Sequence, residues 1–316
     1  MGKVKCKAHF ILKRRLYFCF LLKFHILQKN ILLQHMNYLS KAVFILIFST
    51  MGFAAYAMND SISVDSINKQ KITSDAIRFV DGVAYTVSSP IRWKGSDWLK
   101  VGAVLGGTAL LTTLDKPNRN FWQDRNSKVW DGIERAGFHY GKPYAAFIMT
   151  GGFYLTGLVI KNEWARETGL MLGAAYLTSG ALQTLMKTAV GRARPATDVG
   201  PWAFDPFSPE AGYHSFPSGH MQIATVSALV LGHRVKSPLL KALFYSTAGV
   251  TLVSRMYSDS HWLSDMAFGG AISWFCTKAI VRRMEESKYR NPFKKQNQIT
   301  WTVTPARRGI GLVGVF

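Results

Sequence analysis

The chain has 316 residues, of which 48% are hydrophobic and 18% are charged, and its basic residues outnumber its acids to give a net charge of +21. The length and the mean hydropathy of +0.06 fit one large core or several membrane crossings, so this average does not separate the two. The basic residues are scattered at the ends of apolar segments and no nucleic-acid-binding motif occurs. We therefore exclude nucleic acid as a partner and favour anionic lipid and phosphate.

The first 57 residues predict an exported protein. Residues 1–35 contain eight Lys or Arg and no acid. Residues 36–57 have the order of a signal peptide, with Lys41, an apolar run over 42–53 and an A-x-A pattern at 55–57. We interpret residues 1–35 as an upstream mis-extension and 36–57 as the signal peptide. The alternative is that the first segment is a genuine basic, amphipathic membrane arm.

Six apolar runs follow a mature lead over residues 58–98, in which one amphipathic helix is expected around 72–87. The runs lie at 101–114, 144–160, 169–186, 221–231, 239–253 and 266–280. They predict an all-α fold, a six-helix bundle over residues 99–285 that is membrane-embedded or membrane-associated. Several runs are shorter than the roughly 20 residues of a simple membrane span, so a soluble periplasmic bundle stays open.

The charges indicate a topology for the membrane alternative. If the last five runs cross, the basic residues at 233–236 and those beyond residue 281 share one face, which is then cytoplasmic. The motifs described below then fall on the opposite, periplasmic face. Six complete crossings would conflict with an exported start, so the run at 101–114 is expected to be interfacial or packed outside the bilayer. We expect an exported protein, either in the inner membrane with a periplasmic active site or in the periplasm.

The last segment, 286–316, is a basic tail. Its residues alternate in hydropathy from 299 to 316, around Pro305 and Gly309, and this alternation predicts a short hairpin. No function follows from it.

Three short motifs lie in order between residues 187 and 265. They are K-x6-R-P at Lys187 and Arg194-Pro195, P-S-G-H at Pro217–His220, and S-R-x5-H-x3-D at Ser254-Arg255, His261 and Asp265. Each motif alone is weak, because a His and an Asp four residues apart are more often an ordinary contact on a helix surface. The ordered set is specific, and its two Arg, one Lys and two His are the groups that phosphoryl chemistry uses.

The ordered set resembles the type 2 phosphatidic acid phosphatase superfamily, which also contains bacterial class A acid phosphatases and vanadium haloperoxidases. The resemblance covers residues 187–265 and every motif position. It implies an all-helical fold and metal-independent hydrolysis of a phosphate ester or anhydride through a phosphohistidine intermediate.

The residue chemistry agrees with this resemblance. His261 and Asp265 share one face of a helix, so Asp265 can hold one ring nitrogen of His261 and leave the other free to attack phosphorus. We therefore predict His261 as the nucleophile and Asp265 as its orienting partner. His220 is predicted to protonate the leaving oxygen and then to activate water.

The remaining motif residues are predicted to bind the phosphoryl group. They are Lys187, Arg194, Ser218, Gly219 and Arg255. Ser218 is a plausible helix N-cap, and Gly219 lets a phosphate approach the backbone closely. Arg192 receives the more common role of a solvated or membrane-facing cation. No residue spacing resembles a metal site or a nucleotide loop, so we expect no metal ion and no cofactor.

These residues predict a metal-independent phosphatase that hydrolyses a lipid phosphate or pyrophosphate, of the phosphatidic acid or isoprenyl pyrophosphate type. Its expected partners are that phosphorylated substrate and the membrane. Four alternatives stay open: a soluble periplasmic acid phosphatase of broad specificity, a vanadium haloperoxidase, a lipid phosphotransferase, and a non-catalytic membrane protein that binds phospholipid.

Overall fold

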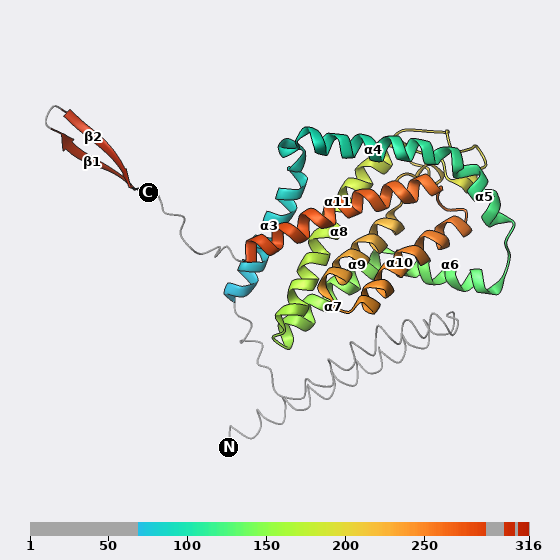
Figure 1. Ribbon diagram of the computed structural model, residues 1–316, viewed down its shortest axis with the longest axis horizontal. Helices are drawn as coiled ribbons and strands as arrows, with labels where there is room; N and C mark the ends of the chain where they lie inside the picture. Colours follow the sequence, from blue (N-terminus) through green and yellow to red (C-terminus); the bar gives the residue numbers. More distant parts are fainter. Residues whose placement is uncertain (1–68, 289–299, 307–308, 316) are drawn as a thin grey trace, which may run out of the picture.

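The structure is a computed structural model that describes residues 69–288, 300–306 and 309–315. The predicted mis-extension and signal peptide lie outside these residues. The described chain is mostly helical, as the apolar runs predicted, with the helices packed into one body (Figure 1).

Nine α-helices occur in the described residues, where the sequence predicted seven: six from the apolar runs and one amphipathic helix ahead of them. They are α3 Lys69–Val87, α4 Gly95–Leu111, α5 Asp115–Gln123, α6 Lys128–Tyr140, α7 Pro143–Val159, α8 Glu163–Val190, α9 Gly219–Arg234, α10 Pro238–Tyr257 and α11 Leu263–Lys288. Each predicted run overlaps one of α4 and α7 to α11, and α3 coincides with the expected amphipathic helix. The unexpected helices are α5 and α6, which contain no continuous apolar run.

Local sequence signals set the helix ends. The side chain of Asn162 accepts a hydrogen bond of 3.0 Å from the N–H of Ala165 and so caps the start of α8. Ser237 caps α10 in the same way, ahead of a proline in its first turn. Gly191 ends α8 in the left-handed conformation that favours glycine. These signals explain why the chain reverses where it does.

The core lies between α8, α9 and α11. Its most buried side chains are Leu172, Ala174, Ala175, Val226, Val230, Ile280 and Met284, and aromatic side chains of α3 and α7 pack against them. The hydroxyls of Tyr176 and Ser227 share a hydrogen bond of 2.6 Å across the α8–α9 contact. This core fixes three of the helices whose ends carry the motifs.

The outer surfaces of several helices are apolar. Helix α4 has no buried residue. Exposed large hydrophobic side chains include Leu99, Leu105 and Leu110 on α4, Phe147 and Leu155 on α7, Leu239 and Leu243 on α10, and Trp274 on α11. Among the helices described, none combines the length and the apolar character needed to cross a membrane.

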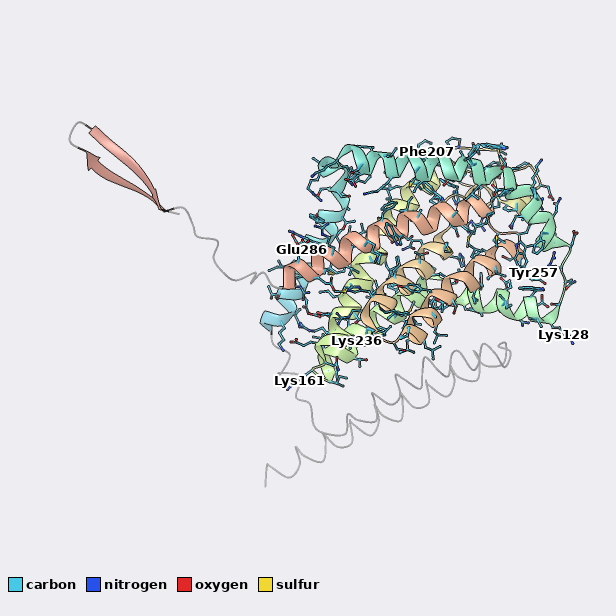
Figure 2. All side chains as sticks on the ribbon, in the orientation of Figure 1. Lys128, Lys161, Phe207, Lys236, Tyr257 and Glu286 are labelled. Atoms are coloured by element: carbon cyan, nitrogen blue, oxygen red, sulfur yellow. The ribbon has the colours of Figure 1, made fainter. Side chains whose placement is uncertain are left out.

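The body has two distinguishable ends in the view of Figure 2. Lys161 and Lys236 mark the connections from α7 to α8 and from α9 to α10, and they lie at the lower edge of the body. Phe207, in the connection from α8 to α9, lies at the upper edge. The long connection that joins the first two motifs is therefore at the end opposite to these short turns.

The predicted hairpin is present. Strands β1 (Thr300–Ala306) and β2 (Gly309–Val315) form an antiparallel pair whose register runs from Thr300 opposite Val315 to Ala306 opposite Gly309.

Helices α7 and α8 pack closely enough to require glycine at their contact. A Cβ at Gly169 on α8 would lie 2.4 Å from the backbone nitrogen of Tyr154 on α7. A Cβ at Gly157 on α7 would lie 2.2 Å from the backbone nitrogen of Arg166 on α8. Both distances are shorter than atoms can tolerate, so any larger residue must push the helices apart.

We expect Gly169→Ala to lower the free energy of unfolding by about 1–3 kcal/mol, because the added methyl group overpacks this contact. Gly151→Ala on α7 is the matched control, since a Cβ there would meet no atom within 4 Å. The control should be neutral or slightly stabilising. Denaturant unfolding of both variants measures the difference, and equal stability would contradict the close α7–α8 packing.

Candidate active site

The three motifs meet at one end of the helical body. Lys187 lies in the last turn of α8 and Arg255 in the last turn of α10. His220 lies in the first turn of α9, and Asp265 in the first turn of α11. Four helix ends therefore bring together residues that are far apart in the sequence.

The segment that carries Arg194 is extended and is fixed by its backbone. Gly191 precedes it with a φ of +57°, and a Cβ there would lie 1.8 Å from the carbonyl oxygen of Asp205, so only glycine fits. The N–H of Asp205 donates to the carbonyl of Gly191 at 2.7 Å, and the N–H of Arg194 donates to the carbonyl of Gly212 at 2.8 Å. The loop thereby determines where the Arg194 side chain begins.

His261 is buried and its orientation is set by a backbone carbonyl. Its Nδ1 lies 2.8 Å from the carbonyl oxygen of Ser215, and because a carbonyl only accepts, Nδ1 carries the proton. The lone pair is then on Nε2. Burial lowers the pKa of His261 to about 4, against the raising effect of Asp265, so the ring is neutral at pH 7. A neutral ring with a free nitrogen is the form that can act as a nucleophile.

The expected direct hydrogen bond between Asp265 and His261 requires a correction. Asp265 Oδ2 lies 3.8 Å from His261 Nδ1, which is longer than a hydrogen bond. The same oxygen accepts from the Ser215 hydroxyl at 2.5 Å and from the N–H of Trp262 at 2.9 Å. The carbonyl of Ser215 is nearer to His261 Nδ1 than the carboxylate is, and it accepts the hydrogen bond that the sequence spacing had assigned to Asp265. Asp265 therefore orients His261 indirectly, by binding Ser215.

Asp265 is fully buried and charged. Burial acts to raise its pKa, but the nearby His261, the charge of Arg192 and the hydrogen bond from the Ser215 hydroxyl outweigh burial and lower the pKa below its usual value. Arg192 supplies the main counter-charge, with Nη1 at 2.5 Å from Asp265 Oδ1. A carboxylate in this environment stays ionised throughout the physiological pH range.

The expectation for Arg192 was wrong. Its side chain is only 3% exposed and donates to Asp265, to Asp115 at 2.8 Å, to Ser264 at 2.7 Å and to the carbonyl of Pro201 at 2.8 Å. It is a buried ion-pair centre and does not face solvent. The sequence could not show this role, because Asp115 lies in the unexpected helix α5.

Neither Lys187 nor Arg194 forms an ion pair with an acidic side chain among the described residues. Lys187 Nζ donates to the carbonyl of His214 at 2.8 Å, and burial together with nearby Arg194 lowers the pKa of Lys187 to about 8. Burial also lowers the pKa of Arg194, and its Nε is buried without a hydrogen-bond partner in the part of the chain described. Buried cations whose donors are free are suited to an anionic ligand.

Arg255 is held by α6. Its guanidinium contacts the carboxylate of Glu134, donates to the hydroxyl of Ser254 at 2.8 Å, and lies 4.9 Å from the ring centre of Phe138. Burial lowers the pKa of Arg255 and Glu134 opposes that shift. The ion pair with Glu134 fixes the orientation of the Arg255 guanidinium and partly neutralises its charge.

His220 lies beside His261, with 6.3 Å between the ring centres. Phe138 stacks on the His220 ring with 5.7 Å between the ring centres, and a Cβ at Gly141 would lie 2.7 Å from the Cβ of His220, so α6 fits closely against it. The buried Nε2 of His220 has no hydrogen-bond partner among the described residues. Burial, followed by the charge of Arg255, lowers the pKa of His220 to about 2.

The start of α9 completes the candidate site. The Ser218 hydroxyl accepts from the N–H of Met221 at 3.4 Å, so Ser218 is the N-cap as predicted. A Cβ at Gly219 would lie 3.4 Å from Gln183 Oε1, an ordinary contact. Packing against the protein therefore does not require glycine here, and its absent side chain leaves room for a ligand near the helix N-terminus.

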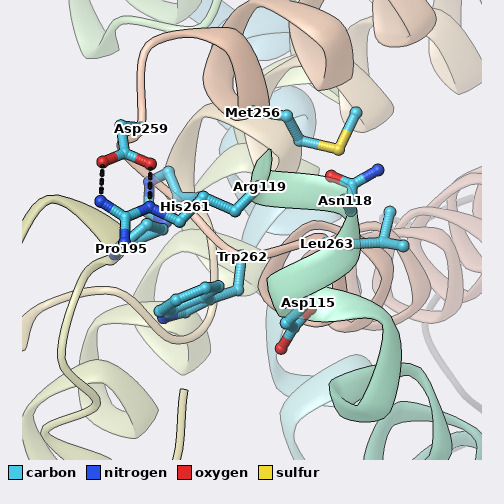
Figure 3. Close-up of a pocket in the computed structure, with 9 residues that line it drawn as sticks. All are labelled: Asp115, Asn118, Arg119, Pro195, Met256, Asp259, His261, Trp262 and Leu263. Carbon is cyan, nitrogen blue, oxygen red and sulfur yellow. Dashed lines mark hydrogen bonds and ion pairs between the residues drawn. The ribbon is translucent and has the colours of Figure 1, made fainter. Parts of the chain in front are cut away.

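A shallow recess opens beside His261 (Figure 3). It is lined by Asp115, Asn118, Arg119, Pro195, Met256, Asp259, His261, Trp262 and Leu263. Arg119 donates two hydrogen bonds of 2.7 Å to Asp259, drawn as dashed lines. The sequence did not single out α5, because most of its residues are polar and none belongs to the motifs.

The contribution of α6 was also missed. Glu134 and Phe138 contact Arg255, although they lie more than 100 residues from it in the chain. One signal was present: Gly137 and Gly141 are four apart and share a helix face. A Cβ at Gly137 would lie 2.4 Å from the Cβ of Ser254, so this glycine face marks where α6 meets the site.

The arrangement places a neutral imidazole, a second histidine and three cations around one end of the bundle. Such a site can neutralise the oxygens of a phosphoryl group while a ring nitrogen approaches phosphorus. The residues predicted for binding and for bond exchange are therefore brought together.

Comparison with known proteins confirms the resemblance that the motifs indicated. Residues 168–289 match the PAP2 superfamily. The chain is 37% identical over 113 residues to a lipid A 1-phosphatase of Rhizobium etli, covering 34% of this chain and 47% of that protein. It is 36% identical over 110 residues to a lipid A 1-phosphatase of Rhizobium johnstonii, covering 34% and 44%. The chain thus matches about half the length of these curated relatives.

Two solved structures are also similar. Aquifex aeolicus LpxE has a TM-score of 0.41 and 19% identity, with 54% of this chain and 95% of that chain covered. A transmembrane PAP2 type phosphatidylglycerolphosphate phosphatase from Bacillus subtilis has a TM-score of 0.47 and 15% identity, with 60% and 96% covered.

The buried, neutral state of His261 predicts a pH effect on stability. Its pKa is about 4 in the folded protein and about 6.5 in an unfolded chain, so the unfolded state binds more protons between these values. Stability should fall as the pH drops from 7 to 5, by up to about 2 kcal/mol from this group.

Urea unfolding of wild type and His261→Asn at both pH values measures this contribution. Asn is the matched replacement because its amide can still donate to the Ser215 carbonyl. We expect the wild type to lose more stability than the variant between pH 7 and 5. The same loss in both proteins would show that His261 is not buried in its neutral form.

Proposed function

We propose that this chain, whose residues 168–289 match the PAP2 superfamily, is a phosphatase that hydrolyses the phosphate of a phosphorylated lipid. The observation that carries the proposal is the buried His261, with its Nδ1 held by the Ser215 carbonyl and its Nε2 free. Its neutral ring lies near Lys187 and Arg194, and Arg255 lies near His220, so the proposed nucleophile and the charges needed for its target share one site.

The first step is attack by the Nε2 of His261 on phosphorus. The N–P bond forms while the bond from phosphorus to the leaving oxygen breaks, and His220 gives its proton to that oxygen. His220 is neutral in the empty site because burial and nearby cations disfavour its charged form. A bound phosphate dianion counteracts those cations and favours protonation of His220, which couples the proton donor to substrate binding.

The second step returns the enzyme to its starting state. After the first step His220 is neutral and accepts a proton from water as the water oxygen attacks phosphorus. The N–P bond breaks, and inorganic phosphate leaves as His261 recovers its lone pair. As phosphate leaves, His220 gives the proton it gained to the product or to solvent, because the empty site favours the neutral ring. The next substrate restores the proton, so each cycle consumes one water molecule.

The cations stabilise the charge on the phosphoryl oxygens through both steps. Lys187 and Arg194 have free donors for an anion, and Arg255 adds a planar, bidentate guanidinium held in place by Glu134. The Gly219 amide at the start of α9 adds a further donor. Because side chains supply this neutralisation, we propose that hydrolysis needs neither a metal ion nor a cofactor.

A lipid is the favoured substrate for two reasons. The curated relatives are lipid A 1-phosphatases. The connection between the first two motifs exposes large apolar side chains, with Trp202 63% and Phe207 73% accessible to solvent. Such side chains beside a phosphate site suit an acyl chain or a membrane surface. We propose a membrane-associated, exported protein whose site faces the periplasm.

The test is phosphate release by purified protein in mild detergent with a chelator. The substrates are phosphatidic acid, a phosphorylated lipid A, an isoprenyl pyrophosphate and a small water-soluble ester. We expect lipid substrates to be preferred by at least about tenfold in kcat/KM, and His261→Ala to lose about 1,000-fold in kcat.

His233→Ala is the matched control, because His233 lies at the end of α9 away from the site and contacts Glu285 at 2.6 Å. It should retain wild-type turnover. Unchanged turnover in His261→Ala would exclude the mechanism. Preference for the small ester would favour a soluble acid phosphatase, and activity restored only by added metal would exclude metal-independent hydrolysis.

A further inference from the structure

We propose that Arg119 of α5 is a positioning residue that acts through Asp259. It keeps the loop that carries Arg194 and the loop that carries His261 in a fixed position relative to each other. The inference rests on the proposed function for its link to turnover. Arg119 lies outside all three motifs and touches none of the groups assigned to bond exchange, so its action is indirect.

Arg119 contacts both loops at once. Its Nε and Nη2 donate to the two carboxylate oxygens of Asp259 at 2.7 Å each, which is a bidentate pair. Its Nη1 lies 2.7 Å from Asp198 Oδ1. Hydrogen bonding to Asp259 raises the pKa of Arg119, so the guanidinium stays charged. One side chain thus joins the segment after Arg194 to the segment before His261.

Both aspartates have unusual backbone conformations. Only four non-glycine residues in the described chain have a positive φ, and these include Asp198 at 60° and Asp259 at 54°. A left-handed conformation costs an L-residue roughly 1–2 kcal/mol, although Asp tolerates it better than most. The structure therefore holds both loops in less favourable conformations at the two residues that Arg119 contacts.

The two loops also touch each other. The N–H of Ala196 donates to the carbonyl of Asp259 at 3.2 Å. Asp259 lies two residues before His261, and Ala196 lies two residues after Arg194. A shift of the Asp259 backbone would therefore move the nucleophile relative to the phosphate-binding cation.

A second residue of helix α5, one turn before Arg119, also contacts this region. Asp115 accepts from the N–H of Ser264 at 2.9 Å, from its hydroxyl at 2.6 Å, and from Arg192 at 2.8 Å. Asp115 and Arg119 are four apart and share one face of the helix. That face contacts the start of α11 and both loops, which gives α5 a role that its polar sequence did not reveal.

The two ion pairs of Arg119 are not equal. The Asp198 side chain is 77% exposed, and pairs of this kind contribute about 0–1 kcal/mol. The Asp259 side chain is 18% exposed and makes the bidentate contact, which has a stronger and more directional geometry. We therefore assign the positioning effect to the contact between Arg119 and Asp259.

The experiment compares Arg119→Met, Arg119→Lys, Asp259→Asn and the double variant Arg119→Met/Asp259→Asn in the full chain. Asn is chosen to replace Asp259 because it also tolerates a positive φ, so the substitution removes mainly the charge of the carboxylate. Lys116→Met is the control, since it removes an exposed cation from the same helix.

We expect kcat to fall at least tenfold in Arg119→Met and Asp259→Asn, with KM changed less than threefold. Arg119→Lys should recover part of the loss, and the double variant should be no worse than either single variant because both remove one contact. Lys116→Met should keep wild-type kcat. Wild-type kcat in Arg119→Met would overturn the proposal.

Hydrogen exchange gives a measurement that does not depend on turnover. Arg119→Met should raise exchange in peptides covering 195–200 and 256–262, and leave α9 peptides unchanged. A rise throughout the chain would indicate general destabilisation and would also overturn the proposal. If wild type releases no phosphate from any substrate, the proposed function fails, while the exchange data still decide whether Arg119 fixes these loops.

Discussion

The ion pair between Arg192 and Asp265 is the contact on which the site depends. Both side chains are almost fully buried, and their atoms approach to 2.5 Å. Loss of one member of such a pair leaves an unpaired buried charge, which typically costs about 3–5 kcal/mol. The same two residues bond to Asp115 of α5, to Ser215 and to Ser264 at the start of α11. The pair therefore joins the first motif to the last and fixes the carbonyl that orients His261.

Burial determines which ionisable groups of the site are neutral and how strongly the charged ones act. It keeps His261 neutral, which is the form that the proposed attack on phosphorus requires, and it keeps His220 neutral while the site is empty. It also strengthens the field of Lys187 and Arg194 for any anion that enters, because little water screens them. In the empty site these buried cations lack a counter-ion, which is electrostatically unfavourable. A bound phosphate dianion would supply that counter-ion. In the proposed mechanism, the burial of these groups therefore accounts both for phosphate binding and for the state of the two histidines.

The sequence predicted those features that depend on local patterns. The apolar runs identified α4 and α7 to α11, and the ordered motifs identified the residues that the fold brings together. It did not predict α5 and α6, whose mixed sequences carry no periodic run. It could not assign Ser215 to His261, because a backbone carbonyl has no sequence signature. Glu134 and Arg192 were missed or misassigned because their partners are distant in the chain, and only tertiary contact makes them buried ion pairs.

The most direct measurement is to trap phosphate on the protein. His220→Ala would be mixed with para-nitrophenyl phosphate, whose leaving group needs no proton donor, and quenched during the first turnover. Without His220 to activate water, the intermediate should accumulate, and mass spectrometry in alkaline conditions should locate phosphate on His261. Nitrophenol release without a phosphoenzyme, or with phosphate on another residue, would contradict His261 as the nucleophile.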